Sequence, residues 1–369
     1  MKYYIIAGEA SGDLHGGNLI RAIREKDPKA IIRCWGGGQM ESAGGEVVKH
    51  YRDLAFMGFA EVVKNLPAIF QNIRWCKKDI EDFQPDVLVL IDYPGFNLII
   101  APWAKKKGFK VAYYISPQVW AWKESRVKKM KTCIDQMMVI LPFEKDYYQN
   151  KWNWKVSYVG HPLTEVVNKS LEQAPASPLS DKPIIALLPG SREQEINKKL
   201  PIMLEVSKQF PSYQFIVAKA PGTRESFYKQ VLAQYPEIKW VEGQTYELLK
   251  QATAALVTSG TATLETALFG VPQVVCYKGS FLSYEIGKRL ISIKYISLVN
   301  LIMDKPVVPE LIQQDLTEER VERELQSLLE DPRRRSEMQA DYTSLWNKLQ
   351  STGSASEQAA GVILDLLAK

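Results

Sequence analysis

Short apolar runs alternate with amphipathic stretches along nearly the whole chain. Apolar runs bounded by Gly, Ser, Pro and Asp are typical of strands buried on both faces of a parallel sheet, and the helical spacing between them predicts helices. The alternation therefore predicts an α/β protein. The predicted strands are residues 3–7, 31–35, 86–91, 110–115, 136–141 and 156–159 in the first half, and 184–188, 214–218, 254–257 and 273–277 in the second.

A polar stretch separates the two halves. Residues 168–183 (NKSLEQAPASPLSDKP) are rich in proline and show neither helical nor strand periodicity, as expected for a linker. We therefore predict an N-terminal domain over residues 1–167 and a C-terminal domain over residues 184–350, with a crevice between them. The last segment, residues 351–369, has apolar positions at helical spacing, and we expect it to pack back on the N-terminal domain.

Composition narrows the class of protein. Of the 369 residues, 46% are hydrophobic and 24% are charged, as in ordinary globular domains, and a net charge of +5 is too small to indicate a general binder of nucleic acid. The four cysteines lie far apart, so neither a zinc site nor a disulfide framework is expected. Because no signal-peptide pattern is present and no apolar stretch approaches the ~20 residues that span a membrane, we expect a cytoplasmic protein.

A strand–turn–helix unit in the second half carries the strongest binding signal. A buried strand ends in the small residues 258–260, and a helical pattern follows over 261–269. Free backbone N–H groups and the positive end of a helix dipole suit a phosphate there, and the Glu265 carboxylate could accept hydrogen bonds from both hydroxyls of a ribose. A second such turn, at 189–192, adds the fixed charge of Arg192. The alternative is an ordinary strand–helix connection with a favourable cap.

Carboxylates follow the buried strands of the first half. Asp92 stands directly after the strand at 86–91, and in open α/β sheets ligands bind beyond the carboxyl ends of strands. A carboxylate among apolar neighbours can have the raised pKa of a general base, but an Asx-type turn before Pro94 is the alternative. Glu9 and Asp13 lie in the first strand–helix turn, where they are equally consistent with helix N-terminal charges. This turn lacks GxGxxG, which argues against a Rossmann dehydrogenase.

Two segments combine apolar and basic residues. Residues 54–78 predict an amphipathic helix that suits either packing on the core or contact with a lipid surface. Residues 120–131 interleave two tryptophans with basic residues, which fits a solvated helix face, single-stranded nucleic acid or a membrane surface. The candidates for lipid or acyl-chain contact are Phe56, Met57, Leu66, Ile69, Phe70, Ile73 and Arg74.

A set of short motifs, in order along nearly the whole chain, resembles the lipid-A-disaccharide synthase family. Each motif is weak alone, but the ordered set is specific. The resemblance implies a GT-B fold, in which two Rossmann-like domains face each other across a cleft, and an inverting glycosyltransferase that needs no metal or cofactor. The motifs are AGEASGD (7–13), MGFAEV (57–62), IDYPGFN (91–97), SPQVWAW (116–122), LPFE (141–144), VGHP (159–162), LLPGSRxxE (187–195), SGTATLE (259–265) and SLVNLI (297–302).

The implied reaction joins two acylated sugars in lipid A biosynthesis. The donor would be UDP-2,3-diacylglucosamine and the acceptor 2,3-diacylglucosamine 1-phosphate (lipid X), giving a tetraacyl disaccharide 1-phosphate and UDP. Without a metal, helix N-termini and an arginine must stabilise the charge on the departing UDP, and the sequence has no DxD motif. Lipid substrates favour peripheral contact of segment 54–78 with the inner membrane from the cytoplasmic side. Nucleic acid is not an implied partner, and a homodimer is left open.

The resemblance also assigns residues. The aspartate of the family's IDxP motif falls on Asp92, the expected general base, which acts directly or through another group such as Glu9 or His15. The arginine of the GSR motif falls on Arg192 and the asparagine of the SLxNL motif on Asn300, both functionally important positions in the family. Some relatives carry an acidic residue at the position of Gly95. The expected UDP contacts are Gly190, Ser191, Arg192, Ser259, Gly260, Thr261, Thr263 and Glu265.

Two other functions are open on the sequence. UDP-N-acetylglucosamine 2-epimerases share the two-domain cleft and the UDP half-site but act on one soluble sugar, so segment 54–78 and the IDYPGFN match argue against them. A non-catalytic nucleotide-sugar or nucleic-acid binding protein is suggested only by residues 120–131, and it predicts that Asp92 is dispensable.

Overall fold

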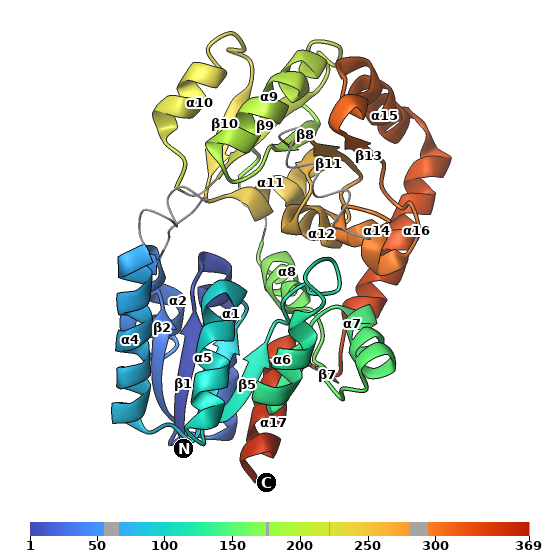
Figure 1. Ribbon diagram of the computed structural model, residues 1–369. Helices are drawn as coiled ribbons and strands as arrows, with labels where there is room; N and C mark the ends of the chain where they lie inside the picture. Colours follow the sequence, from blue (N-terminus) through green and yellow to red (C-terminus); the bar gives the residue numbers. More distant parts are fainter. Residues whose placement is uncertain (55–65, 175–176, 221, 280–293, 369) are drawn as a thin grey trace. The chain divides into compact units, whose positions relative to one another are not determined.

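The chain forms two compact α/β units, each built on a parallel sheet (Figure 1). The computed structural model describes residues 1–54, 66–174, 177–220, 222–279 and 294–368. The first unit comprises residues 1–162 together with 349–369, and the second comprises residues 163–348. The predicted alternation of strands and helices is confirmed in both.

The first unit holds a seven-stranded sheet in the order β3-β2-β1-β4-β5-β6-β7, with every neighbouring pair parallel. The chain starts at β1, moves outward through β2 and β3, and then returns to β4 on the other side of β1. The strand order therefore reverses between β1 and β4, and such a switch point is where open α/β sheets bind ligands. The strands are β1 (Lys2–Ala7), β2 (Ile31–Gly36), β3 (Glu46–His50), β4 (Val87–Ile91), β5 (Lys110–Tyr114), β6 (Gln136–Val139) and β7 (Ser157–Tyr158).

Helices cover both faces of this sheet, because successive strand side chains point to opposite sides. Helices α4, α5 and α6 bury apolar residues against one face, and α1 and α17 bury theirs against the other. The end of the chain thus returns to complete the core of the first unit. The helices are α1 (Ala10–Lys26), α2 (Gly38–Ser42), α4 (Leu66–Phe83), α5 (Pro94–Lys106), α6 (Arg126–Cys133), α7 (Pro142–Asp146) and α17 (Ala355–Ala368).

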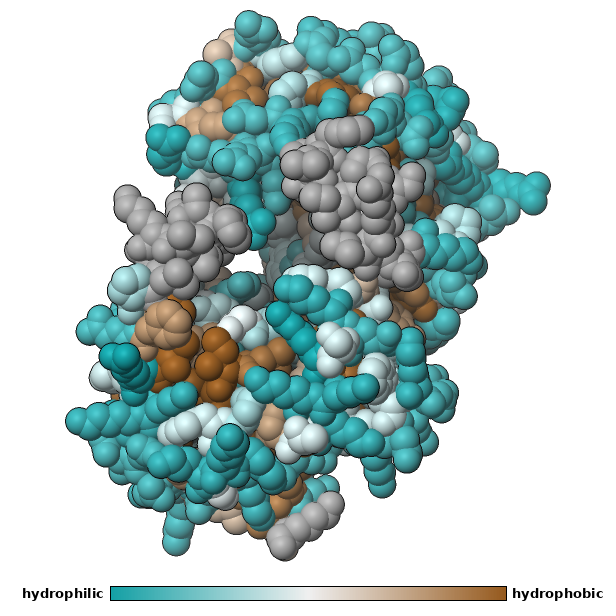
Figure 2. Space-filling view, in the orientation of Figure 1, coloured by the Kyte–Doolittle hydropathy of each residue, from teal (hydrophilic) through white to brown (hydrophobic). Residues whose placement is uncertain are grey.

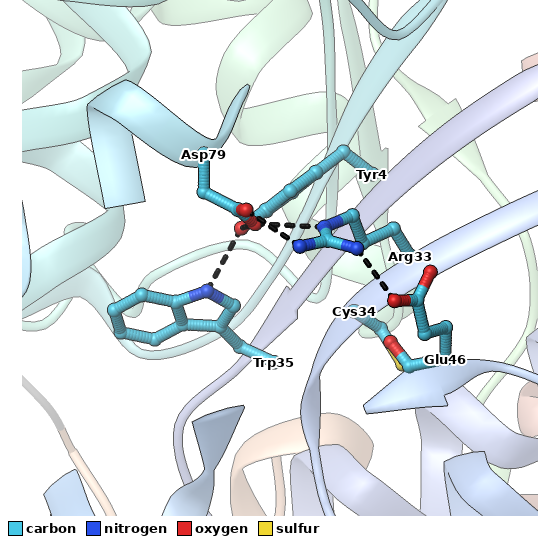
Figure 3. Close-up of polar contacts among 6 residues, drawn as sticks. All are labelled: Tyr4, Arg33, Cys34, Trp35, Glu46 and Asp79. Carbon is cyan, nitrogen blue, oxygen red and sulfur yellow. Dashed lines mark hydrogen bonds and ion pairs between the residues drawn. The ribbon is translucent and has the colours of Figure 1, made fainter. Parts of the chain in front are cut away.

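A polar network fixes α4 on the sheet (Figure 3). Asp79 of α4 accepts two hydrogen bonds from the Arg33 guanidinium, at 3.0 and 2.7 Å, and one from the Tyr4 hydroxyl at 2.6 Å. Trp35 Nε1 donates to the Tyr4 hydroxyl at 2.9 Å, and Arg33 also pairs with Glu46 of β3. A bidentate pair of this kind adds geometric specificity, so it sets which side of α4 faces the sheet.

The second unit holds a six-stranded parallel sheet in the order β10-β9-β8-β11-β12-β13. Its strand order reverses between β8 and β11. The strands are β8 (Ile184–Leu188), β9 (Gln214–Lys219), β10 (Lys239–Glu242), β11 (Ala252–Thr258), β12 (Gln273–Tyr277) and β13 (Glu310–Ile312). The helices are α8 (Pro162–Glu172), α9 (Glu193–Ser207), α10 (Glu225–Val231), α11 (Thr245–Gln251), α12 (Thr261–Leu268), α14 (Leu298–Met303), α15 (Glu318–Glu330) and α16 (Pro332–Leu349).

The segment between the two sheets is partly helical. Helix α8 runs to Glu172, so the first residues of the polar 168–183 stretch belong to a helix, and its residues 175–176 lie outside the described ranges. Across those ranges, none of the helices combines the length and the apolar character that crossing a membrane requires.

Candidate functional site

The second unit contains a pocket of about 330 Å³ at the switch point of its sheet. The pocket lies beyond the carboxyl ends of β9, β8 and β11, where open α/β sheets bind their ligands. Its volume is at the lower end of the range for small-molecule sites. The lining residues are Leu188, Gly190, Ser191, Glu195, Ala218, Lys219, Ala220, Thr245, Thr258, Ser259, Gly260, Thr261, Ala262 and Glu265.

The turn after β11 forms one wall of this pocket. Gly260 has φ +146°, a conformation that L side chains rarely adopt, and α12 begins at the next residue. The hydroxyl of Ser259 donates to the carbonyl of Ile296 at 2.8 Å, which holds the turn in place. Thr263 was expected to contact UDP. It is instead fully buried, and its hydroxyl donates a hydrogen bond to the Gly260 carbonyl at 2.8 Å. The surfaces left for a ligand are therefore the backbone of the turn and the first residues of α12.

Glu265 lies one turn into α12 and lines the pocket. One of its carboxylate oxygens accepts a hydrogen bond from the Tyr246 hydroxyl at 2.7 Å, and burial raises the pKa of the carboxyl group. The other carboxylate oxygen of Glu265 takes no part in the hydrogen bond with Tyr246. Glu265 also borders a second hollow of about 530 Å³, which Tyr246 and Lys169 help to line, so its carboxylate sits where two hollows meet.

The turn after β8 forms the opposite wall. Gly190 has φ +116°, and Ser191 and Glu195 line the pocket beside it. Arg192 is the residue before α9; its side chain is 64% exposed and pairs with Glu195 at 3.5 Å. An exposed guanidinium next to a turn of this kind can pair with a diphosphate in a bidentate manner. On the β9 side, the buried Lys219 lines the pocket and pairs with Glu242.

The side chain of Asn300 is buried and bonds within the protein, unlike that of a residue that faces a substrate. It is buried in α14, and its amide group donates to the carbonyl of Val308 and to Glu310, both at 2.9 Å, and accepts from the amide of Val308 at 2.9 Å. Ser297 also donates to Glu310, at 2.7 Å through its hydroxyl. Asn300 thus ties α14 to the segment that leads into β13.

In the first unit, Asp92 lies at the carboxyl end of β4, next to the switch point between β1 and β4. Asp92 and Tyr93 both have positive φ, +44° and +48°, and a pair of left-handed non-glycine residues is strained. The surroundings hold this strain in place, because the Asp92 carbonyl accepts hydrogen bonds from the Tyr113 hydroxyl at 2.6 Å and from Asn97 at 2.8 Å. Such strain is typical of functional sites.

The electrostatics of Asp92 suit a general base. Burial, followed by the negative charge of Glu9, raises the pKa of Asp92 to about 6. Glu9 is exposed and precedes α1, at the end of the neighbouring strand β1. The ring of Tyr93 packs over Gly8 so closely that a Cβ atom there would lie 2.3 Å from the ring. Gly95 is exposed, and a Cβ there would meet no heavy atom within 4 Å, so a larger side chain would fit.

Asp13, the other carboxylate of the first turn, has a structural role. It is buried and accepts hydrogen bonds from the backbone amides of Gly37 at 2.7 Å, Gln39 at 3.1 Å and Met40 at 3.1 Å. It therefore neutralises the N-terminus of α2 rather than that of its own helix, α1.

Sequence reasoning gave Glu144 of the LPFE motif no role. Its carboxylate is buried and accepts hydrogen bonds from the amide of Leu141 at 3.0 Å and from Trp120 Nε1 at 3.1 Å. Burial raises its pKa to about 7, and the charge of Asp92 adds to that rise. Within segment 120–131, Trp120 therefore points inward, whereas Trp122 is 47% exposed and carries Lys123 over its ring at 4.4 Å.

The candidate lipid-contacting face of α4 is only partly as expected. Ile73 is buried in the core, which contradicts its expected contact with lipid or acyl chains, and Ile69 packs partly on the core as well. Phe70 and Arg74 are exposed, as expected. Phe56 and Met57, and the side chain of Leu66, lie outside the described residues.

Two exposed hydrophobic residues of α4 and α5 were missed by the sequence reasoning. Trp75 of α4 is 41% exposed and Ile99 of α5 is 45% exposed, compared with 58% for Phe70. Hydrophobic side chains gather over α4 and α5 on the face seen in Figure 2. The exposed large hydrophobic residues of these two helices are Phe70, Trp75 and Ile99.

Several solved structures have a similar fold. MnaA from S. aureus, solved with UDP, has a TM-score of 0.70 at 13% identity and covers 100% of this chain and 98% of its own. The UDP-GlcNAc 2-epimerase from Neisseria meningitidis bound to UDP-GlcNAc has a TM-score of 0.68 at 13% identity, with full coverage of both chains. The glycotransferase of kitacinnamycin has a TM-score of 0.67 at 13% identity and covers 99% of each chain. At this identity the likeness confirms the fold class alone.

Sequence comparison is more specific. A family model described as lipid-A-disaccharide synthetase matches residues 3–363. The lipid-A-disaccharide synthase of Syntrophus aciditrophicus is 41% identical and covers 99% of this chain and 97% of its own. The lipid-A-disaccharide synthase of Geobacter metallireducens is 40% identical and covers 100% of this chain and 98% of its own. That of Coxiella burnetii is also 40% identical and covers 98% of each chain. The chain therefore belongs to the lipid-A-disaccharide synthase family.

Proposed function

We propose that this protein transfers a 2,3-diacylglucosaminyl group from UDP to 2,3-diacylglucosamine 1-phosphate, giving the tetraacyl disaccharide 1-phosphate and UDP. The family match over residues 3–363 is the observation that carries the proposal. Such a reaction needs a site for an anionic leaving group and a base for a sugar hydroxyl, and the pocket of the second unit and Asp92 support the proposal as candidates for these two parts.

The pocket of the second unit is the proposed donor site. The turns at 189–192 and 258–260 would hold the diphosphate with backbone N–H groups and the start of α12, as helix N-termini hold anions. Arg192 would pair with the phosphates, and the free oxygen of Glu265 would accept hydrogen bonds from the ribose. Thr263 and Asn300 are proposed to support these walls, because their side chains already bond within the protein.

Asp92 is the proposed general base. With its pKa raised to about 6, the carboxylate is largely ionised at neutral pH yet basic enough to accept a proton in the transition state. It would take the proton of the acceptor hydroxyl as that oxygen attacks the anomeric carbon from the face opposite UDP. The bond from the anomeric carbon to the UDP oxygen breaks, its electron pair leaves with UDP, and the configuration inverts. Glu9 is proposed to tune the pKa of Asp92.

The acylated substrates require contact with a lipid surface. Phe70, Trp75 and Ile99, which are exposed on α4 and α5, are proposed to enter the interface of the inner membrane from the cytoplasmic side. Arg74 and Lys78 of α4 are also exposed and would face anionic headgroups.

The proposal is tested by incubating the purified chain with both acylated sugars in detergent, without divalent metal, and reading the products by mass spectrometry. A disaccharide 1-phosphate and UDP in equal amounts are expected. An altered monosaccharide in place of the disaccharide would instead assign the epimerase reaction, and no conversion with folded protein would refute both.

A further inference from the structure

The buried lysine Lys199 stands beneath the turn that forms one wall of the donor pocket. It lies in α9, is only 2% exposed, and is among the largest fully buried side chains of the described residues. Helical side chains lean towards the N-terminus, which sends this one back towards the turn at 189–192. A Cβ atom built on Gly190 would lie 3.6 Å from Lys199 Nζ, so the ammonium group reaches the backbone of that turn.

This ammonium group has no hydrogen-bond or ion-pair partner in the described part of the chain. Two other cations at this site are paired, Arg192 of the turn with Glu195 and Lys219 of the pocket lining with Glu242. Glu195 is the carboxylate whose charge acts on Lys199, and the Cys276 thiol nearby is neutral because burial raises its pKa to about 12. Burial lowers the pKa of Lys199, the direction expected when an ammonium group is desolvated.

A second polar residue, Thr258, lies at the same turn. Thr258, at the end of β11, lines the pocket, and its buried hydroxyl oxygen has no hydrogen-bond partner in the described residues. The methyl carbon of Thr258 lies 3.6 Å from the same point beside Gly190 that Lys199 approaches. Buried polar groups are normally satisfied, so two unpartnered ones at one turn point to a place where a polar ligand would complete their bonding.

We propose that Lys199 supplies the buried positive charge that holds the diphosphate of a UDP-linked donor, acting from beneath the 189–192 turn. This inference rests on the proposed donor site but not on the acceptor or the transfer step. A buried cation is costly without a counter-charge, whereas a bound diphosphate would supply that charge in a region of low dielectric constant. Lys199 is thus a binding residue that becomes fully paired only when the donor is present.

The test compares ligands that differ in phosphate. Lys199→Met keeps the length of an unbranched side chain and removes the charge, and Lys198→Met, at an exposed position on the same helix, is the matched control. Affinity for UDP is measured by calorimetry, and affinity for uridine by ligand-observed NMR. We expect Lys199→Met to weaken UDP binding about tenfold or more, as for loss of one charge-assisted contact, and to leave uridine binding unchanged. Lys198→Met should change neither.

Other outcomes would overturn the proposal. Unchanged UDP affinity in folded Lys199→Met would show that the charge is not used, and an equal loss for UDP and uridine would assign Lys199 a structural role. Lys199→Gln, which stays polar without the charge, decides the case if the methionine variant fails to fold, since it should show the same selective loss. Because the readout is binding, it is independent of whether the chain forms the disaccharide.

Discussion

At the scale of the residue, surroundings give similar carboxylates different tasks. Asp13 and Asp92 follow buried strands, and the sequence could place both at strand ends but could not separate their roles. Three backbone amides of α2 occupy Asp13, whereas Asp92 stays beside Glu9 with its pKa raised to about 6. These differences come from a distant segment of chain, residues 37–40, and from burial, neither of which a local pattern contains.

The pKa of Asp92 leads to a prediction about pH. Because the base must be ionised, kcat/KM should rise with pH through about 6 and level off above it. Glu9→Gln removes the neighbouring negative charge, so it should lower the pKa of Asp92 and move this acidic limb to lower pH. Glu25→Gln, at an exposed position near the other end of α1, is the control. Identical pH profiles for the Glu9 variant and the wild-type protein would exclude the coupling.

At the scale of the element, long apolar runs were predictive, whereas three short edge strands were not predicted. The central strands are continuous apolar runs, but β3, β10 and β13 are short edge strands that carry charged residues, so no buried-strand pattern marks them. Helix α4 was predictable as a helix, but its orientation was not. The Arg33–Asp79 pair and the packing of Cys76 and Ile80 turn Ile73 inward and leave Phe70 outside.

The orientation of α4 predicts which residues bind lipid. Phe70→Ser combined with Ile99→Ser should weaken sedimentation with vesicles that contain phosphatidylglycerol about tenfold or more, because a fully buried apolar side chain is worth ~1.5–3 kcal/mol. Both residues are exposed, so the fold should be retained. Leu171→Ser, at a 50% exposed position on α8, is the control for loss of surface hydrophobicity. Equal sedimentation of the double variant and the control would rule out Phe70 and Ile99 as membrane contacts.

At the scale of the whole molecule, the first unit is built from both ends of the chain. Ala359, Ala360 and Ile363 of α17 pack with β1 and α1 in one core, and Lys110 donates a hydrogen bond to the carbonyl of Leu366 at 3.0 Å. The periodicity of the last segment showed that it has an apolar face, but the surface it covers depends on tertiary contacts. The division into units was likewise visible only approximately, since helix α8 spans the start of the polar stretch.

Because α17 packs in the core of the first unit, a substitution near the end of the chain should lower the stability of that unit. Ile363→Ala should lower the free energy of unfolding by ~2–5 kcal/mol, as for other large-to-small changes in a core, measured by urea denaturation. Asp365→Ala, at an exposed position on the same helix, should change it little. A similar small effect for both would mean that α17 is not part of the folded core.

The central claim is that donor binding and proton removal are carried by different residues in different units. The most direct measurement compares turnover and UDP affinity in Asp92→Asn, which keeps the size of the side chain and removes the base. We expect turnover to fall about 10²- to 10⁴-fold with the dissociation constant for UDP unchanged. Turnover close to that of the wild-type protein, or loss of UDP binding along with turnover, would contradict the assignment.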